Sequence, residues 1–293
     1  MSADVPQAST QGLFYPDISA SQGAMDLSGV DAVCIKRSEG TYYLNPQYAA
    51  QVAQAKKAGA FYFAYHFLTS EDPKSQAQFC YDNVGPDVGV MVDVETQNQT
   101  GSKPTLAQNV AFVESLRGLG GIVHLNYLPQ WYWNSVWGQP DLTSLKNLGL
   151  ALVSSDYTSY QSGAGWAPYG GWTPTIWQYS DSTLLNGVRV DFNAFLGSGP
   201  ADPHVLTKEL ETLVRTGKLP AARTWQEWDT LGRRSLQQIA VACDMTPSAV
   251  LRATAIHFDR YDPVTHDYLD RVLSGALPAT AKIPAGGRLW VQR

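Results

Sequence analysis

The chain is poor in cysteine, in charge and in long apolar runs. Its three cysteines, Cys34, Cys80 and Cys243, are too few and too widely spaced for a disulfide framework, and no Cys/His spacing resembles a zinc site. No stretch approaches the roughly 20 apolar residues of a membrane span, and the chain's start lacks the basic and apolar segments of a signal peptide. These absences predict a globular protein made in the cytoplasm, with no membrane partner, no metal and no cofactor.

Charge is divided unevenly along the 293 residues. Residues 1–200 hold 9 basic and 16 acidic side chains, whereas residues 201–293 hold 12 basic and 10 acidic ones. The difference indicates two parts with different roles. An excess of two positive charges in the second part is too small to indicate nucleic-acid binding by itself, so no nucleic-acid partner is expected.

Apolar segments alternate with helical ones in the first 200 residues. Helices are predicted over 45–59, over 70–84 with Ser70 as a candidate N-cap, and over 104–119. A short apolar run that ends with Asp17 begins the chain's strands, and further strands are predicted at 30–40, 60–67, 88–95, 121–127, 148–157, 173–180 and 188–195. Strands that are apolar on both faces predict a parallel sheet covered by helices. About eight of them fit a closed α/β barrel, irregular in its second half, where loops replace helices.

Most of these strands end in polar or aromatic residues. In a parallel α/β barrel the carboxyl ends of all strands meet at one mouth, so these side chains should converge there. They are Asp17, Glu39, Tyr65, His66, Asp93, Glu95, Tyr127, Trp177, Gln178, Asp191 and Asn193.

Two of these acids share a strand. Asp93 and Glu95 end an apolar segment and, since strand side chains alternate, point to the same face about 6.5–7 Å apart at their Cα atoms. Two like charges that resist desolvation raise at least one pKa, as a general acid at neutral pH requires. The alternative for any such pair is a solvated strand end.

Aromatic residues suggest the ligand. Loops of the second half contain Trp131, Trp133, Trp137, Trp166 and Trp172. Carboxylates among aromatic rings suit sugars, whose C–H faces pack on the rings while acids bind the hydroxyls. Some of these rings are expected to be core, Trp177 above all.

The first 196 residues or so resemble glycoside hydrolase family 25, the Chalaropsis-type lysozymes and phage endolysins. Each motif is weak alone, but the ordered set is specific: PDIS (16–19), CIKRSEG (34–40), the NPQY…AKKAG helix, AYHF (64–67), VDVE (92–95), NY (126–127), IWQYS (176–180) and VDFN (190–193). The resemblance implies a TIM-like (β/α)5β3 barrel that cleaves the β-1,4 bond after N-acetylmuramic acid in peptidoglycan. It implies catalytic roles for Asp17, Asp93, Glu95 and Asp191, and an aromatic floor of Tyr65, Tyr127 and Trp177.

Glycoside hydrolysis needs a proton for the leaving oxygen and support for positive charge at the anomeric carbon. We expect Glu95 to act as general acid and then base, with Asp93 staying ionised. Asp93 would either orient the substrate's own acetamido group for attack, with retention, or support direct inverting attack by water. Asp17 and Asp191, on strands adjacent in a closed barrel, would hold Asp93 and the sugar. Tyr127 is a candidate partner of the acetamido carbonyl, and His66, Gln178, Glu39 and Asn193 are further candidate substrate contacts.

The C-terminal part is predicted to be a separate, mainly helical module. The expected division is a flexible start at 1–12, the barrel at 13–197, a linker at 198–204 and a module at 205–293, which opens with an amphipathic helix over 205–217. Two further helices are predicted over 235–254. They resemble either a helix-turn-helix or the helical pair of a LysM module, whose closing strand IPAGGRLWVQ (283–292) matches although its Gly-Asp-Thr opening is missing. A helical hairpin without a ligand is the third alternative, and glycan binding is favoured over DNA binding.

These features together predict a monomeric endolysin-type N-acetylmuramidase whose partner is bacterial peptidoglycan. Without a signal peptide, it is expected to be made in a phage host's cytoplasm and to reach the cell wall after holin-type release. The alternatives are a non-catalytic sugar-binding or phage structural protein on the same barrel, and a chitinase-like hydrolase.

Overall fold

The structure, a computed structural model, describes residues 12–97, 99–158, 160, 163–197, 203–219 and 271. The chain divides into two compact units, and the first, residues 1–197 with 201–219, contains all of these residues except Arg271. Apart from Arg271, the second unit lies outside the described residues. The predictions for residues 1–11, for the linker's first five residues and for the LysM-like module therefore stay predictions.

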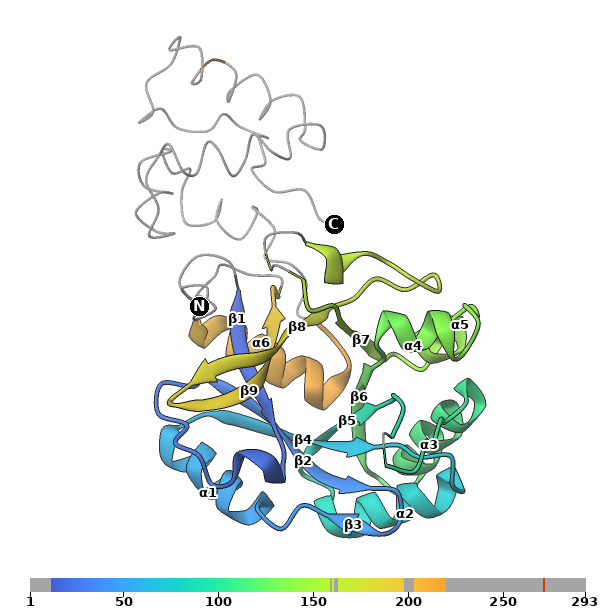
Figure 1. Ribbon diagram of the computed structural model, residues 1–293, viewed down its shortest axis with the longest axis horizontal. Helices are drawn as coiled ribbons and strands as arrows, with labels where there is room; N and C mark the ends of the chain where they lie inside the picture. Colours follow the sequence, from blue (N-terminus) through green and yellow to red (C-terminus); the bar gives the residue numbers. More distant parts are fainter. Residues whose placement is uncertain are drawn as a thin grey trace. The chain divides into compact units, whose positions relative to one another are not determined.

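The elements of the first unit run in the order that the sequence predicts (Figure 1). They are β1 (Leu13–Ile18), the 3-10 turn η1 (Ala20–Gln22), β2 (Ala32–Glu39), β3 (Tyr43–Leu44), α1 (Tyr48–Ala58), β4 (Phe61–Phe67), α2 (Pro73–Val84), β5 (Gly89–Asp93), α3 (Leu106–Gly118), β6 (Ile122–Tyr127), α4 (Gln130–Ser135), α5 (Thr143–Asn147), β7 (Ala151–Ser155), the turn η3 (Ala164–Trp166), β8 (Ile176–Leu185), β9 (Val188–Phe195) and α6 (Pro203–Thr216).

Eight strands close into a barrel in the order β1-β9-β8-β7-β6-β5-β4-β2, with β2 returning to β1 and the two-residue β3 attached to β2. The predicted α/β barrel is confirmed, including its irregular second half: short helices separate β6 from β7, and β8 leads into β9 through a tight hairpin. That hairpin turns at Asn186 and Gly187, which both have positive φ (48° and 82°), as a two-residue turn requires.

The hairpin corrects one expectation about strand direction. β9 runs antiparallel to both β8 and β1, so its beginning, not its carboxyl end, lies beside the ends of the parallel strands. Asp191 reaches the mouth for this reason, directly opposite Asp17 in the β1–β9 pair.

Side-chain alternation sorts each strand into an inner and an outer face. Within the barrel lie Leu13, Tyr15, Cys34, Phe63, Tyr65, Met91, Leu125, Tyr127, Val153, Ile176 and Phe195. Outside, one cluster packs against α2 and α3, and another packs against α1 and the outer faces of β1, β2, β8 and β9. Alternate residues on the inner faces lead from this apolar interior to the acids at the mouth.

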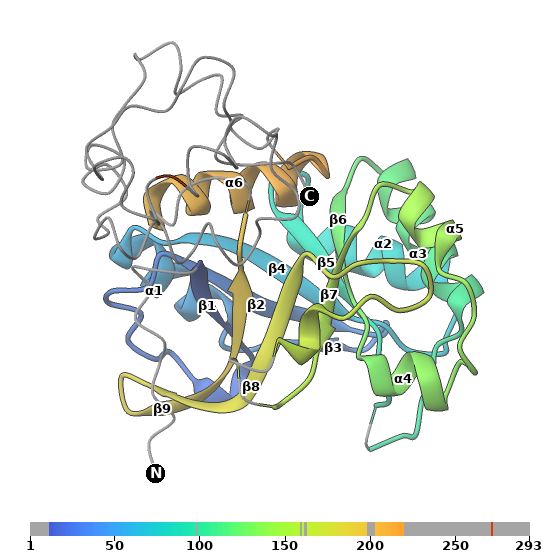
Figure 2. The same ribbon diagram turned by 90° about the horizontal axis from the view of Figure 1, so that it is seen from above.

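Helix α6 lies across the end of the barrel at which the parallel strands begin (Figure 2). The acids lie at the other end of those strands. It contacts β1, β4, β5 and β6, and its buried apolar residues, Leu206, Leu210, Leu213 and Val214, join the interior cluster. The approach is close, because a Cβ added to Gly89 at the start of β5 would lie 2.2 Å from Val214. This helix was expected to open the C-terminal module, but it belongs to the barrel's unit.

Local capping explains where the helices begin and end. Asp72, not Ser70, caps α2, since its side chain accepts a hydrogen bond from the Ser75 amide, with Pro73 in the first turn. Thr105 and Gln108 form a reciprocal capping box at α3. α1 ends at Gly59, which is left-handed as predicted for a C-terminal glycine.

Candidate active site

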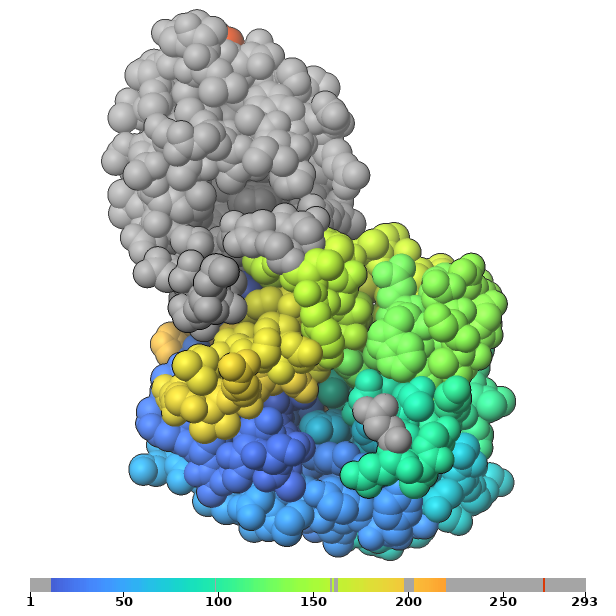
Figure 3. All heavy atoms as spheres, viewed as in Figure 1, coloured from blue at the N-terminus to red at the C-terminus, as the bar shows by residue number. Residues whose placement is uncertain are grey.

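Four acids predicted from separate segments gather at the mouth of the barrel. Asp17, Asp93 and Asp191 lie on the inner faces of β1, β5 and β9, and Glu95 follows β5 by two residues. Asp17 and Asp93 are each only 7% exposed. Figure 3 shows this face hollowed where the β8–β9 segment (yellow) adjoins segments coloured blue to teal.

Asp17 is held on one oxygen by two amide donors. Gln178 Nε2 and Asn193 Nδ2 donate to Asp17 Oδ2 at 2.9 and 2.7 Å. Burial raises the pKa of Asp17, while these donors and a hydrogen bond from Asp191 oppose the rise. Burial and the neighbouring Asp17 carboxylate raise the pKa of Asp191 to about 8. Asp191 therefore carries a proton at neutral pH and shares it with Asp17.

The Asp93–Glu95 pair is the most strained electrostatically. Burial, followed by the Glu95 carboxylate, raises the pKa of Asp93 well above its usual range, with Asp17 and Asp191 adding to the effect. Burial and Asp17 raise the pKa of Glu95 to about 7, against the opposing charge of Lys36. The expectation that Asp93 is ionised therefore does not describe the ligand-free site, where four carboxylates cannot all be charged.

One oxygen of Asp93 could accept a hydrogen bond from a ligand. Among the described residues, Asp93 Oδ1 is buried and has no hydrogen-bond partner. A buried acceptor left unpaired costs about 1–3 kcal/mol. An N–H donor from a bound molecule would remove that cost and would also favour the ionised form of Asp93.

Gln178 connects the acids to two tyrosines. Tyr127 and Tyr157 donate their hydroxyls to Gln178 Oε1 at 3.0 and 2.6 Å, while the other end of the amide donates to Asp17. This fixes the orientation of the Gln178 amide. Tyr157 follows β7 and is 52% exposed. It was not among the residues selected from the sequence, although it ends the strand predicted over 148–157 and the convergence of strand ends could have identified it.

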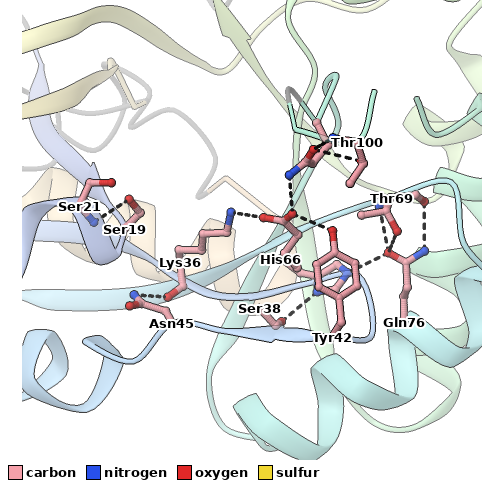
Figure 4. Close-up of polar contacts among 12 residues, drawn as sticks. Ser19, Ser21, Lys36, Ser38, Tyr42, Asn45, His66, Thr69, Gln76 and Thr100 are labelled. Atoms are coloured by element: carbon pink, nitrogen blue, oxygen red, sulfur yellow. Dashed lines mark hydrogen bonds and ion pairs between the residues drawn. The ribbon is translucent and has the colours of Figure 1, made fainter. Parts of the chain in front are cut away.

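Glu39 and Lys36 form an ion pair on the inner face of β2. A register shift between Lys36 and Ser38 in the β2–β4 pairing places both residues on that face, opposite Tyr65 and Phe67 respectively. Lys36 Nζ lies 2.6 Å from Glu39 Oε2, while Tyr42 and Gln97 donate to Glu39 Oε1 at 2.9 and 3.1 Å. Figure 4 shows the side chains of Lys36 and Tyr42 pointing toward the same place, with dashed lines that mark their polar contacts.

Two predicted substrate contacts lie elsewhere. His66 is fully buried on the outer face of β4, where its ring bonds Ser38 and Gln76 and stacks on Phe112 at 4.7 Å. Burial lowers its pKa to about 3, so it remains neutral. It is a core residue because strand alternation sends it opposite to Tyr65 and Phe67.

Trp177 is likewise a core residue. It is fully buried outside the barrel, its Nε1 donating to the Asp156 carbonyl, and Gly165 packs so closely that an added Cβ would lie 2.1 Å from the indole. Its neighbour Gln178 takes the inward position instead. The other predicted contacts, Tyr65, Tyr127, Gln178, Glu39 and Asn193, all lie on inner faces near the acids.

Three exposed aromatic residues surround the mouth. They are Tyr42, Trp131 and Tyr157, which are 55%, 48% and 52% exposed and follow the ends of β2, β6 and β7. They are the large exposed aromatics of the described residues. Such rings offer apolar faces to a ligand that extends beyond the acids.

The described residues offer neither a metal site nor a membrane span. They contain no group of three or more His, Cys, Asp or Glu side chains placed to hold a metal ion. They also contain no helix with the length and apolarity needed to span a bilayer.

The family model described as "Glycosyl hydrolases family 25" matches residues 16–188, which is more than half of the chain. The matched residues include three of the four acids, Asp17, Asp93 and Glu95. The chain belongs to this family. The predicted assignment to glycoside hydrolase family 25 is thereby confirmed.

Individual relatives agree with the assignment. The N,O-diacetylmuramidase of Chalaropsis sp is 29% identical over 197 residues, which cover 58% of this chain and 89% of that protein. The lysozyme of Streptococcus phage Cp-7 is 38% identical over 88 residues, 30% of this chain and only 24% of that lysozyme. The muramidase structure from Trichobolus zukalii is 25% identical with a TM-score of 0.56, covering 70% of this chain and all of that one.

Proposed function

We propose that this chain is an N-acetylmuramidase that hydrolyses the β-1,4 bond between N-acetylmuramic acid and N-acetylglucosamine in bacterial peptidoglycan. The observation that carries the proposal is the buried carboxylate group of the mouth, in which Glu95 has a pKa of about 7. A general acid needs a pKa near the working pH, so that it is protonated yet able to release its proton. The name of the Chalaropsis relative supports the choice of substrate.

The proposed reaction begins with proton transfer from Glu95 to the leaving glycosidic oxygen. The acetamido N–H of the sugar donates to Asp93 Oδ1, the buried oxygen that lacks a partner in the ligand-free site. This bond favours the charged form of Asp93, which in turn stabilises positive charge on the acetamido group as its oxygen attacks the anomeric carbon. Glu95, now ionised, takes a proton from the water that opens the cyclic intermediate, giving net retention.

The remaining groups at the mouth hold this arrangement in place. Asp17, kept in position by Gln178 and Asn193, sustains the negative potential that stabilises an oxocarbenium-like transition state. Tyr127 belongs to the same hydrogen-bonded network through Gln178. Burial and then the charge of Glu95 raise the pKa of its hydroxyl. The rings of Tyr42, Trp131 and Tyr157 suit the flanking sugars of a glycan chain.

The test is digestion of purified peptidoglycan followed by mass spectrometry of the products. We expect new reducing ends on N-acetylmuramic acid. Reducing ends on N-acetylglucosamine, or release of peptides alone, would contradict the muramidase proposal, and cleavage of unsubstituted chitin at a similar rate would favour the chitinase alternative. A Glu95→Gln protein serves as the negative control.

We further propose that the protein is an endolysin whose second unit binds cell walls. The match to a phage lysozyme supports this origin, although it spans only a quarter of that lysozyme. The test compares the full chain with a fragment ending at Leu219, after α6. We expect the full chain alone to sediment with cell walls, and neither protein to bind duplex DNA.

A further inference from the structure

Lys36 lies beside the acids of the mouth, since its ammonium lies over Phe67, the residue that pairs with Asp93 between β4 and β5. Its surroundings are unusual for a lysine. Its side chain is 13% exposed, although long charged side chains usually extend into water. The ammonium lies over the rings of Phe67, Tyr43 and Tyr65, at 4.7, 5.5 and 5.9 Å from their centres. A desolvated ammonium over aromatic faces is held by the negative charge of those faces.

A single carboxylate neutralises this ammonium. Glu39 Oε2 accepts from Lys36 at 2.6 Å, while Glu39 Oε1 already accepts from Tyr42 and Gln97. Both oxygens of Glu39 are thus engaged, and Lys36 and its hydrogen bonds keep the pKa of Glu39 below its usual range despite burial. A carboxylate so saturated is poorly suited to bind a sugar hydroxyl, the role that the sequence suggested for it.

We propose that Lys36 is a positioning residue whose ammonium, fixed by Glu39 and enclosed by three aromatic rings, favours the ionised forms of both Asp93 and Glu95 at working pH. This inference deepens the proposed function and rests on it. The titratable and charged groups around the ammonium are Glu39 of β2, Tyr42 after it, Tyr43 of β3, Tyr65 of β4 with His66 on its far face, Asp93 of β5 and Glu95.

The direction of the effect follows from the charges. The ammonium lowers the pKa of both Asp93 and Glu95. Lys36→Met keeps much of the apolar stem but removes the charge, so both acids should hold their protons to higher pH. Glu39→Gln leaves the ammonium without its counter-ion, so both acids should release their protons at lower pH. The two variants therefore shift the acids in opposite directions, which loss of packing alone would not do.

The first measurement is the initial rate on soluble peptidoglycan fragments, below saturation, from pH 4 to pH 10. We expect the alkaline limb of the Lys36→Met protein to move up by about 1 pH unit, that of Glu39→Gln to move down, and that of Lys36→Arg to stay in place. The matched control is Lys56→Met, which removes an exposed lysine stacked on Tyr62 on the outside of the barrel. Limbs that stay fixed, or that move together, would overturn the proposal.

The second measurement needs no turnover. In full-length protein with 13C-labelled glutamate carboxyls, NMR titration reads the pKa of Glu95 directly, with the Glu95→Gln spectrum as the assignment. If wild-type protein fails to cleave peptidoglycan, the proposed function falls, yet opposite shifts of the Glu95 signal still support the role of Lys36. If cleavage occurs and the signal does not shift, the role of Lys36 falls alone. Should Lys36→Met not fold, Glu39→Gln decides by the same titration.

Discussion

Asp17 and Asp191 are directly paired across the antiparallel contact of β1 and β9, 174 positions apart in sequence, and share one proton. The carboxylates of the mouth repel one another in the folded state, and this repulsion adds to the effect of burial on their pKa values. The pKa of Asp191 is about 8, and that of Glu95 about 7, against ordinary values of 3.8 and 4.5. At a pH between the ordinary and the raised pKa of each residue, the folded protein holds a proton that the unfolded chain has released.

Stability should therefore fall as the pH rises from about 4 to about 8, because over that range the unfolded chain has released protons that Asp191 and Glu95 still hold in the folded protein. Asp191→Asn removes one of these charges. We expect its melting temperature to exceed that of wild type by about 2–4 °C at pH 8, corresponding to roughly 1 kcal/mol, and to match it at pH 4, where both acids are protonated. The control is Asp87→Asn on an exposed loop. An equal effect at both pH values would refute the shared-charge explanation.

Removing the proposed general acid should abolish turnover without harming the fold. We expect Glu95→Gln to reduce the rate of cell-wall clearing by about 10²- to 10⁴-fold, the usual contribution of general acid catalysis, while sedimentation with walls continues. Glu114→Gln, an exposed position on α3, is the matched control. Wild-type clearing by the Glu95→Gln protein would show that another group delivers the proton.

The pH profile should report the same residue. Since Glu95 must be protonated to act and its pKa is about 7, the rate should decline as the pH rises through about 7. In Glu95→Gln, any residual rate should lack this limb. The measurement is the initial rate of release of reducing ends across pH 4 to pH 10. Persistence of the limb in the variant would assign it to another group.

Stereochemistry distinguishes acetamido assistance from direct attack by water. Two successive displacements at the anomeric carbon give retention, so proton NMR of fresh digests should show the β-anomer first, before mutarotation. Asp93→Asn should reduce turnover by about 10²-fold or more, because the group that stabilises the acetamido cation is lost. Asp82→Asn on the exposed face of α2 is the control. Early appearance of the α-anomer would favour the inverting scheme.

Helix α6 should contribute to the stability of the barrel. Leu210→Ala removes a fully buried side chain that joins the interior cluster, so we expect a loss of about 2–5 kcal/mol of unfolding free energy. Leu219→Ala, at a position that is 39% exposed, should change stability by less than about 0.5 kcal/mol. Denaturant melts of the full chain, followed by tryptophan fluorescence, make the comparison. Equal stability of the two variants would mean that α6 is dispensable.

The sequence predicted the barrel and its four acids because both depend on local pattern. Apolar strands that end in polar residues identify the mouth of a parallel barrel, and the order of short motifs identifies the family. The order of the elements and the positions of Asp17, Asp93 and Glu95 follow from those signals, whereas Asp191 reaches the mouth because β9 is antiparallel.

What the sequence did not predict depends on which way a strand faces. His66 and Trp177 stand one residue from inward-facing positions, and a single step along a strand reverses the side chain. The register shift after Lys36, which turns Glu39 inward, has no sequence signature that periodicity can detect. Helix α6 was misplaced since its amphipathic pattern shows that it packs, but not against which partner.

Closure of the barrel by its first and last strands has a consequence for biosynthesis. β1 leaves the ribosome early, yet its partner β9 and the sealing helix α6 follow more than 170 residues later. A nascent chain therefore carries Asp17 and Asp93 without Asp191 to join them, and contacts this distant in sequence are slow to form. The enzyme becomes competent only after nearly its whole barrel has been translated, which delays any attack on a glycan until synthesis of that unit is complete.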